Sequence, residues 1–294
     1  MVYTVGHFSE RAPFGFTVEG CAAPETAQAK AARLVRTARE PGCEFQQAWT
    51  AGKVPEFIAV FIQHPTPFYD DSYVLNSANN GPYGDAITQE LIPEIDKRYR
   101  TIPSAYARTL TGGSTGGWDV LALQVHYPDV FGGAWSLYPD QLDFRNYQFG
   151  NVYVDANAFV TNERSWLPRE VPSSRSPEGM TELTMREENS AELVMATNGY
   201  DWRDYVQRNW STIGPRLVGK LHVAVGDMDN YFLNLGVYRF ETFLESTKEP
   251  GNGPFYAGTF DYGRPLKPHG WQPWSNQELL RIMHEQVQRN RPRP

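Results

Sequence analysis

The pentapeptide Gly112-Gly113-Ser114-Thr115-Gly116 constrains the fold of this chain more than any other feature, because it has the form G-x-S-x-G. An apolar run at 106–110 precedes it, and a helix-like run at 118–127 follows it. A serine on a sharp turn from a strand to a helix adopts a strained backbone and exposes its hydroxyl as a nucleophile. The pentapeptide alone would also suit a glycine-rich turn, so the rest of the sequence has to decide between the two.

Composition indicates a folded protein and excludes some partners. The 294 residues are 40% hydrophobic and 21% charged, which suits one domain over 1–294 with a sizeable core. A net charge of −7 argues against nucleic acid as a partner. We find no apolar run long enough to span a membrane and no signal-peptide pattern at the start. No cysteine spacing suggests a metal; Cys21 and Cys43 suit either one disulfide or two free thiols.

Apolar strand-like segments alternate with amphipathic helix-like ones. The run at 56–63 is typical of a buried parallel strand. The predicted strands are 2–5, 56–63, 106–110, 133–137, 221–226 and 254–260, and the predicted helices are 25–39, 85–99, 118–127, 231–247 and 276–289. This alternation predicts an α/β fold with a mainly parallel sheet flanked by helices.

Residues 143–214 interrupt the alternation. The segment is polar, contains Pro168, Pro172 and Pro177, and is rich in aromatic residues. We therefore predict that it is a lid or cap inserted into the single domain and packed over the ends of the strands.

A serine nucleophile needs a histidine base and a carboxylate that orients the histidine. His269 lies in a loop after the last predicted strand, whereas His222 lies inside a predicted buried strand and His284 inside a helix. The acid is expected just after the strand at 221–226, where Asp229 is preferred. Asp227 is the alternative, and either aspartate would also suit an N-cap of the next helix.

Two backbone N–H groups are needed to bind an oxyanion. The amide of Thr115 is one candidate because it begins the predicted helix. The second is expected in the loop at Gly6-His7, which follows the first predicted strand. Four aromatic residues are candidate walls of a substrate site, although such rings also suit a core. They are Trp118, Trp135, Tyr138 and Trp271.

Several of these segments together resemble the esterase family of α/β-hydrolases that includes esterase D, feruloyl esterases, enterochelin esterases and the antigen 85 mycolyltransferases. The resemblance rests on the segment LTGGSTGGWDVLALQVHYPDVFGGAWS around Ser114 and on ELIPEID with YRT at 90–101. The segments Gly226–Asp229 and HGWQPW at 269–274 resemble the acid and base segments of the family. The predicted lid matches no part of it.

The resemblance implies an α/β-hydrolase fold and a serine carboxylic-ester hydrolase. Ser114, His269 and Asp229 would act through an acyl-enzyme on a small-molecule or carbohydrate-linked ester, without a metal or an organic cofactor. Two alternatives stay open: an acyltransferase with the same three residues, and a truncated, inactive binding domain.

The sequence also departs from the family pattern. Family members have strands before the one that leads to the first oxyanion loop, whereas here that strand begins at Met1-Val2-Tyr3. Missing N-terminal strands would expose a sheet edge, so we expect either pairing with another chain, such as a second copy, or marginal stability. A truncated start would also fit a secreted or periplasmic protein, and the compartment is otherwise left open. Thr115 stands where the family has Met, which still supplies the required N–H.

Overall fold

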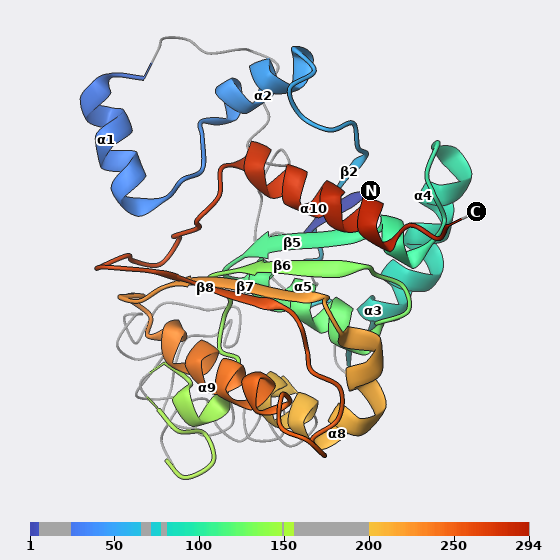
Figure 1. Cartoon of the computed structure of the whole chain (residues 1–294), viewed down its shortest axis with the longest axis vertical. Helices are drawn as coiled ribbons and strands as arrows, with labels where there is room; N and C mark the ends of the chain where they lie inside the picture. The colour runs from blue at the N-terminus through green and yellow to red at the C-terminus, as the bar shows by residue number, and fades with distance from the viewer. Residues whose placement is uncertain (6–24, 66–71, 78–80, 149, 156–199, 294) are drawn as a thin grey trace.

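A parallel β-sheet forms the centre of the computed structural model (Figure 1). The structure describes residues 1–5, 25–65, 72–77, 81–148, 150–155 and 200–293. Its six strands have the order β2-β1-β5-β6-β7-β8, and every neighbouring pair is parallel. The strands are β1 (Val2–Val5), β2 (Ala59–Ile62), β5 (Thr109–Gly113), β6 (Gly133–Leu137), β7 (Leu221–Gly226) and β8 (Thr259–Gly263), beside a small antiparallel pair of β3 (Asn76–Ser77) and β4 (Gly81–Pro82).

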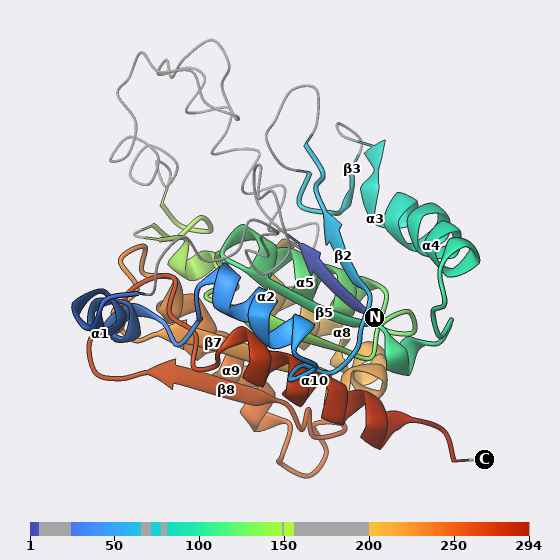
Figure 2. The ribbon, with the colours of Figure 1, turned by 90° about the horizontal axis from the view of Figure 1, so that it is seen from above.

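Helices cover both faces of the sheet. α2 and α10 lie over one face, and α5, α8 and α9 lie over the other (Figures 1 and 2). The α-helices are α1 (Ala27–Arg36), α2 (Gly42–Thr50), α3 (Tyr83–Asp85), α4 (Ile92–Arg98), α5 (Thr115–His126), α8 (Trp202–Leu217), α9 (Leu233–Ser246) and α10 (Asn276–Asn290). A π-helical turn, η2 (Ala86–Leu91), joins α3 to α4, and two 3₁₀ turns are η3 (Ala105–Ala107) and η4 (Phe144–Asn146).

Each face of the sheet contributes to its own apolar core, because successive side chains of a strand point to opposite faces. On β7, Val223 and Val225 belong to the core shared with α5, α8 and α9, whereas Ala224 belongs to the core shared with α2 and α10. On β6, Ala134 and Trp135 divide in the same way. The central strands are therefore buried on both sides, as their nearly continuous apolar sequences indicate.

Some predicted boundaries are wrong. The strand expected at 254–260 begins only at Thr259, because Ala257 has a φ of 51° and leaves the extended conformation. Similarly, η3 occupies 105–107, so β5 begins at Thr109. The helix α2 was not anticipated; it begins after Pro41 and buries Phe45 completely.

The strand predicted to be buried at 56–63 is instead an edge of the sheet that the described residues form. Among these residues β2 pairs with β1 alone, and three of its four residues are only half-buried. An edge strand has one row of unpaired backbone groups along it. Its apolar sequence resembles that of a central strand, which is why the sequence pattern alone misplaces it.

The last part of the predicted insertion is a helix of the main fold, α8. Its Trp202 is fully buried and packs against Trp118 of α5, with ring centroids 4.7 Å apart. Residues 156–199 lie outside the described residues, so a lid at that place stays a prediction.

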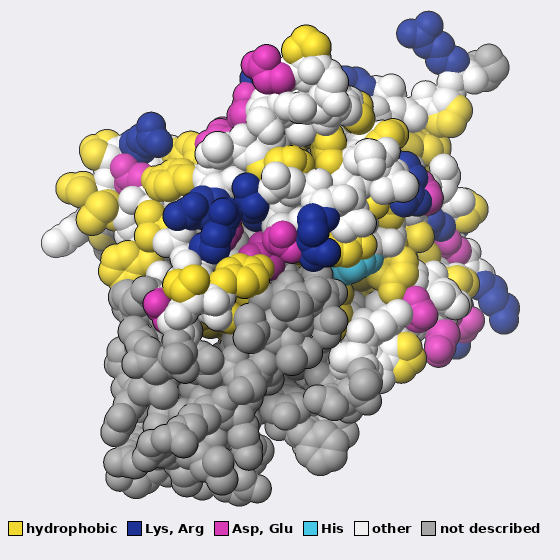
Figure 3. Space-filling view, turned by 90° about the horizontal axis from the view of Figure 1, so that it is seen from below, with side chains coloured by type: hydrophobic (Ala, Val, Ile, Leu, Met, Phe, Trp, Pro, Cys, Tyr) yellow, Lys and Arg dark blue, Asp and Glu magenta, His cyan; other side chains and the backbone are white. Residues whose placement is uncertain are grey.

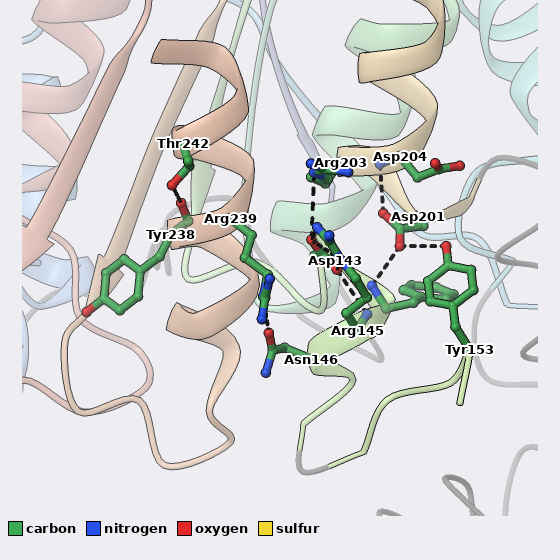
Figure 4. A network of polar contacts seen from close by, with 11 residues as sticks. Asp143, Arg145, Asn146, Tyr153, Asp201, Arg203, Asp204, Tyr238, Arg239 and Thr242 are labelled. Atoms are coloured by element: carbon green, nitrogen blue, oxygen red, sulfur yellow. Dashed lines mark hydrogen bonds and ion pairs between the residues drawn. The ribbon is translucent and has the colours of Figure 1, made fainter. Parts of the chain in front are cut away.

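A polar network joins the chain before residue 156 to the chain after residue 199 (Figure 4). The buried carboxylate of Asp201 accepts hydrogen bonds from Phe144 N at 2.8 Å, the Tyr153 hydroxyl at 2.9 Å and Asp204 N at 3.0 Å. The buried Asp143 pairs with Arg145 beside it. The hydrogen bonds of Asp201 therefore hold the chain on both sides of residues 156–199 to the main fold.

On the surface over α8 and α9, basic and acidic side chains lie next to one another (Figure 3).

Acid should destabilise the fold through His222. Its imidazole lies in β7, stacks on Trp135 with centroids 4.5 Å apart, and has its pKa lowered by burial to about 4. In the unfolded chain the imidazole takes up a proton as the pH falls below about 6.5, whereas in the folded chain it does so only near pH 4. The free energy of unfolding therefore decreases as the pH is lowered from about 6.5 to about 4. From pH 7 to pH 5 the loss attributable to His222 is on the order of 2 kcal/mol.

Urea unfolding at several pH values measures this dependence. His222→Gln should make the fall between pH 7 and pH 5 shallower. His284→Gln on the surface of α10 is the matched control and should leave it unchanged. An identical fall in the wild type and the His222→Gln variant would contradict the prediction.

Candidate active site

Ser114 lies on a tight turn between β5 and α5. Its backbone has φ 59° and ψ −126°, a conformation that residues other than glycine rarely adopt. The turn needs glycine nearby: a Cβ on Gly112 would lie 2.3 Å from the Gly116 carbonyl oxygen and 2.7 Å from that of Val5. The Ser114 N–H donates to Leu137 O at 3.0 Å, which ties the turn to β6. The predicted strand–turn–helix context of the pentapeptide is therefore present.

Ser114, His269 and Asp229 lie in hydrogen-bonding distance of one another, although they are far apart in the sequence. Ser114 Oγ is 3.0 Å from His269 Nε2, and His269 Nδ1 is 2.7 Å from Asp229 Oδ2. Because a carboxylate accepts hydrogen bonds, Nδ1 carries the proton and Nε2 is left to accept from the serine hydroxyl. In serine hydrolases an arrangement of this kind activates the serine for attack on a carbonyl carbon.

Neighbouring side chains hold the imidazole in place. The ring of His269 meets Tyr138 and Tyr231 edge-on, at centroid distances of 5.0 and 4.7 Å. Asp229 is 3% exposed as a residue, and the second oxygen of its carboxylate accepts from Tyr231 N at 2.9 Å. The His269 N–H donates to Asn230 Oδ1 at 3.2 Å. The two residues are thus fixed by the same short β7–α9 connection.

Asp227, the alternative to Asp229, has a different place in the structure. Its Oδ1 accepts from Lys267 N at 3.2 Å, and its own N–H donates to Gly263 O at 3.1 Å. Asp227 therefore binds the backbone of the loop that carries His269, whereas Asp229 contacts the imidazole itself. Sequence spacing alone could not separate these two roles.

Thr115 begins α5, so its N–H has no acceptor within the helix. The N-terminal end of a helix favours negative charge, as an oxyanion site requires. The other predicted donor, His7, lies outside the described residues. That half of the predicted oxyanion site stays a prediction.

Asp140 is a charged neighbour of Ser114 that our sequence analysis missed. Its Oδ2 accepts from the Thr115 hydroxyl at 2.9 Å, and its Oδ1 lies 3.5 Å from Ser114 Oγ. The sequence could have indicated this position. Asp140 follows the end of β6, which lies next to β5 in the sheet. The carboxyl ends of parallel strands meet at one edge of a sheet, so Asp140 comes close to Ser114. A carboxylate therefore lies beside the reactive hydroxyl.

The four candidate substrate walls do not all lie at this site. Tyr138 lines a cavity together with Ser114. Trp118 and Trp135 are 3% and 1% exposed and belong to the two apolar cores, so neither lines that cavity. Trp271 is partly buried and packs against the core shared by α2 and α10. Of the four, Tyr138 lines the cavity and also packs against the imidazole of His269.

The described residues also bear on metals, on membranes and on the two cysteines. No group of three or more His, Cys, Asp or Glu among them could hold a metal ion. None of the helices described is long and apolar enough to cross a membrane. Cys43 is disulfide-bonded, and Cys21, the other cysteine of the chain, lies outside the described residues. The disulfide interpretation of the two is thus the one supported.

The parallel sheet, with helices on both faces and Ser114, Asp229 and His269 at the carboxyl ends of its strands, is an α/β-hydrolase fold. The chain belongs to the family described as "Putative esterase", whose model matches residues 43–216. The earlier resemblance to this family is confirmed.

Solved structures share this fold at low sequence identity. A ferulic acid esterase matches with a TM-score of 0.50 and 15% identity, over 97% of this chain and 82% of its own. The S-formylglutathione hydrolase FrmB from Staphylococcus aureus has a TM-score of 0.49 and 13% identity, over 97% and 83%. No curated protein sequence matches the chain. Together, the family and the fold support a hydrolase of carboxylic esters in general.

Proposed function

We propose that the protein is a serine carboxylic-ester hydrolase that acts through an acyl-enzyme. The observation that carries the proposal is the continuous hydrogen-bonded chain from Ser114 Oγ through His269 to Asp229, with links of 3.0 and 2.7 Å. Membership of an esterase family supports the same class of reaction. The natural ester is expected to be a small-molecule or carbohydrate-linked one.

Each group has a defined role in the proposed reaction. Ser114 Oγ attacks the ester carbonyl carbon while His269 Nε2 takes the hydroxyl proton. The oxyanion is stabilised at the N-terminal end of α5, where the Thr115 N–H is available. His269 then gives the proton to the departing alcohol, and a water molecule repeats the sequence on the acyl-serine. Asp229 holds the imidazole in the required tautomer throughout.

Pre-steady-state hydrolysis of p-nitrophenyl acetate tests this proposal. We expect a burst of about one equivalent of p-nitrophenol per protein molecule, followed by slower turnover, because the acyl-serine accumulates. Added alcohols then separate hydrolysis from acyl transfer: a hydrolase releases mainly free acid, and a transferase mainly a new ester. A folded protein that releases no p-nitrophenol would contradict the proposal and favour an inactive binding domain.

A further inference from the structure

A small cavity of about 210 Å³ opens beside Ser114, between the ends of the central strands and the start of α10. It is smaller than the roughly 300–1,000 Å³ of pockets that bind drug-sized ligands, so it suits a short chain. Val5, Phe61 and Leu279 give it apolar walls. This is the space next to the proposed nucleophile in which one part of an ester would lie.

The position of the base indicates which part of the ester this is. The departing alcohol has to lie near His269 Nε2, which protonates it. His269 is not among the described residues that line the cavity, whereas Ser114 and Gly113 are. The cavity therefore suits the acyl group, which stays attached to Ser114 Oγ after the alcohol has left.

Arg39 is the one charged side chain among the described residues that line this cavity. The hydrogen bonds of Arg39 to described residues involve its backbone: its N–H donates to Thr37 Oγ1 at 3.1 Å, and its carbonyl accepts from Arg33. No described carboxylate thus neutralises the guanidinium. Arg39 is a half-buried residue of the cavity wall; an arginine at such a place favours an anion, and its planar donors match a carboxylate.

The segment that carries Arg39 is held against the start of α10. Ala38 N donates to Gln272 O at 3.2 Å. The carboxylate of Glu40 accepts from Asn276 N at 2.6 Å and Gln277 N at 3.1 Å. Both carboxylate oxygens of Glu40, the residue next to Arg39, thus bind backbone N–H groups at the N-terminal end of α10. The backbone on both sides of Arg39 is accordingly held in place, which reduces the entropy lost when a ligand binds.

Asp140 determines where along the acyl chain an anion is tolerated. Its Oδ1 lies 3.5 Å from Ser114 Oγ, so it repels negative charge next to the reacting carbonyl. An anionic group is therefore favoured at the distal end of the acyl chain. We propose that the protein prefers monoesters of short dicarboxylic acids, with the free carboxylate bound by Arg39; this inference rests on the proposed esterase function.

Two esters that differ in charge alone test the assignment. Monoethyl glutarate carries the distal carboxylate, and the ethyl ester of glutaramic acid replaces it by a neutral amide of similar shape. The wild type should hydrolyse the carboxylate ester with a kcat/KM about tenfold higher, as expected for a charge-assisted pair. In Arg39→Gln the ratio of the two constants should fall to about one, and Arg39→Lys should retain part of the preference.

Arg208→Gln is the matched control, because Arg208 is exposed on α8 and pairs with Asp204. It should keep the wild-type ratio. If Arg39→Gln does not fold, inhibition of the wild type gives the same test: glutaramate, whose one carboxylate can bind Arg39, should inhibit at about tenfold lower concentration than the neutral diamide of glutaric acid.

Hydrolysis of p-nitrophenyl acetate separates the two ways in which the inference can fail. A wild type that hydrolyses it, but shows no preference between the glutarate esters, overturns the assignment of Arg39 alone. An Arg39→Gln variant that keeps the wild-type ratio does the same. A folded wild type that hydrolyses none of the three esters overturns the proposed function itself.

Discussion

Ser114→Ala should reduce kcat/KM for p-nitrophenyl butyrate by roughly 10⁵-fold or more, because no other described hydroxyl lies against His269 Nε2. The same change should abolish covalent labelling by an alkyl fluorophosphonate. Intact-protein mass spectrometry would show one adduct on the wild type and none on the variant. Thermal unfolding of both proteins checks that the variant is folded.

Ser246→Ala on α9 is the matched control. The Ser246 hydroxyl donates to Phe243 O at the end of α9 and has no described hydrogen bond to Ser114, Asp229 or His269. Its activity and labelling should match those of the wild type. If Ser114→Ala retained wild-type hydrolysis, Ser114 would not be the nucleophile, and the esterase activity would have to come from another group.

Asp229→Asn should lower kcat by about 10⁴-fold, with little change in overall structure. Asn presents a similar shape, but its NH₂ group and its neutral oxygen hold the imidazole in the wrong tautomer or fail to stabilise the imidazolium. The buried, 2.7 Å contact between Asp229 Oδ2 and His269 Nδ1 makes the site sensitive to this change. Steady-state kinetics with p-nitrophenyl butyrate measures it.

Asp227→Asn separates the two neighbouring acids. Its side-chain oxygen can still accept from Lys267 N, as the carboxylate does at 3.2 Å in the wild type. We expect kcat to change by less than about tenfold, since the loop that carries His269 keeps its support. Equal losses in the Asp227→Asn and Asp229→Asn variants would contradict the distinct roles that we infer for them.

Much of this fold could be predicted from local sequence. The runs that form β6 and β7 are mostly apolar, so each segment by itself indicates a strand that is buried on both faces of the sheet. The strand–turn–helix around Ser114 is also local, because glycines and a helix start lie within a few residues of it. The prediction failed at β2, which is as apolar as a central strand but lies at the edge of the sheet. Which strands are neighbours is a property of the whole sheet and not of one segment.

In the site, too, residues that belong to a known order along the chain could be predicted, whereas residues placed by contacts between distant segments could not. His269 and Asp229 could be proposed because the order serine, acid, histidine along the chain is common to α/β-hydrolases. Trp118 and Trp135 were proposed as walls from their size and position alone, and burial in the cores excludes them from the cavity. Arg39 gave no signal, because its place beside Ser114 depends on contacts of 38–40 with the start of α10.

The separation of the site residues along the chain has a consequence for how activity arises during synthesis. Ser114 and the turn that holds it are made early, but its contact with His269 spans 155 positions. Asp229 follows β7 and His269 follows β8, so the residues that complete the site come with the last two strands of the sheet. Under the proposed mechanism, a nascent or clipped chain that lacks its last strand can form the turn but lacks the base for its hydroxyl. Esterase activity would then report completion of the sheet.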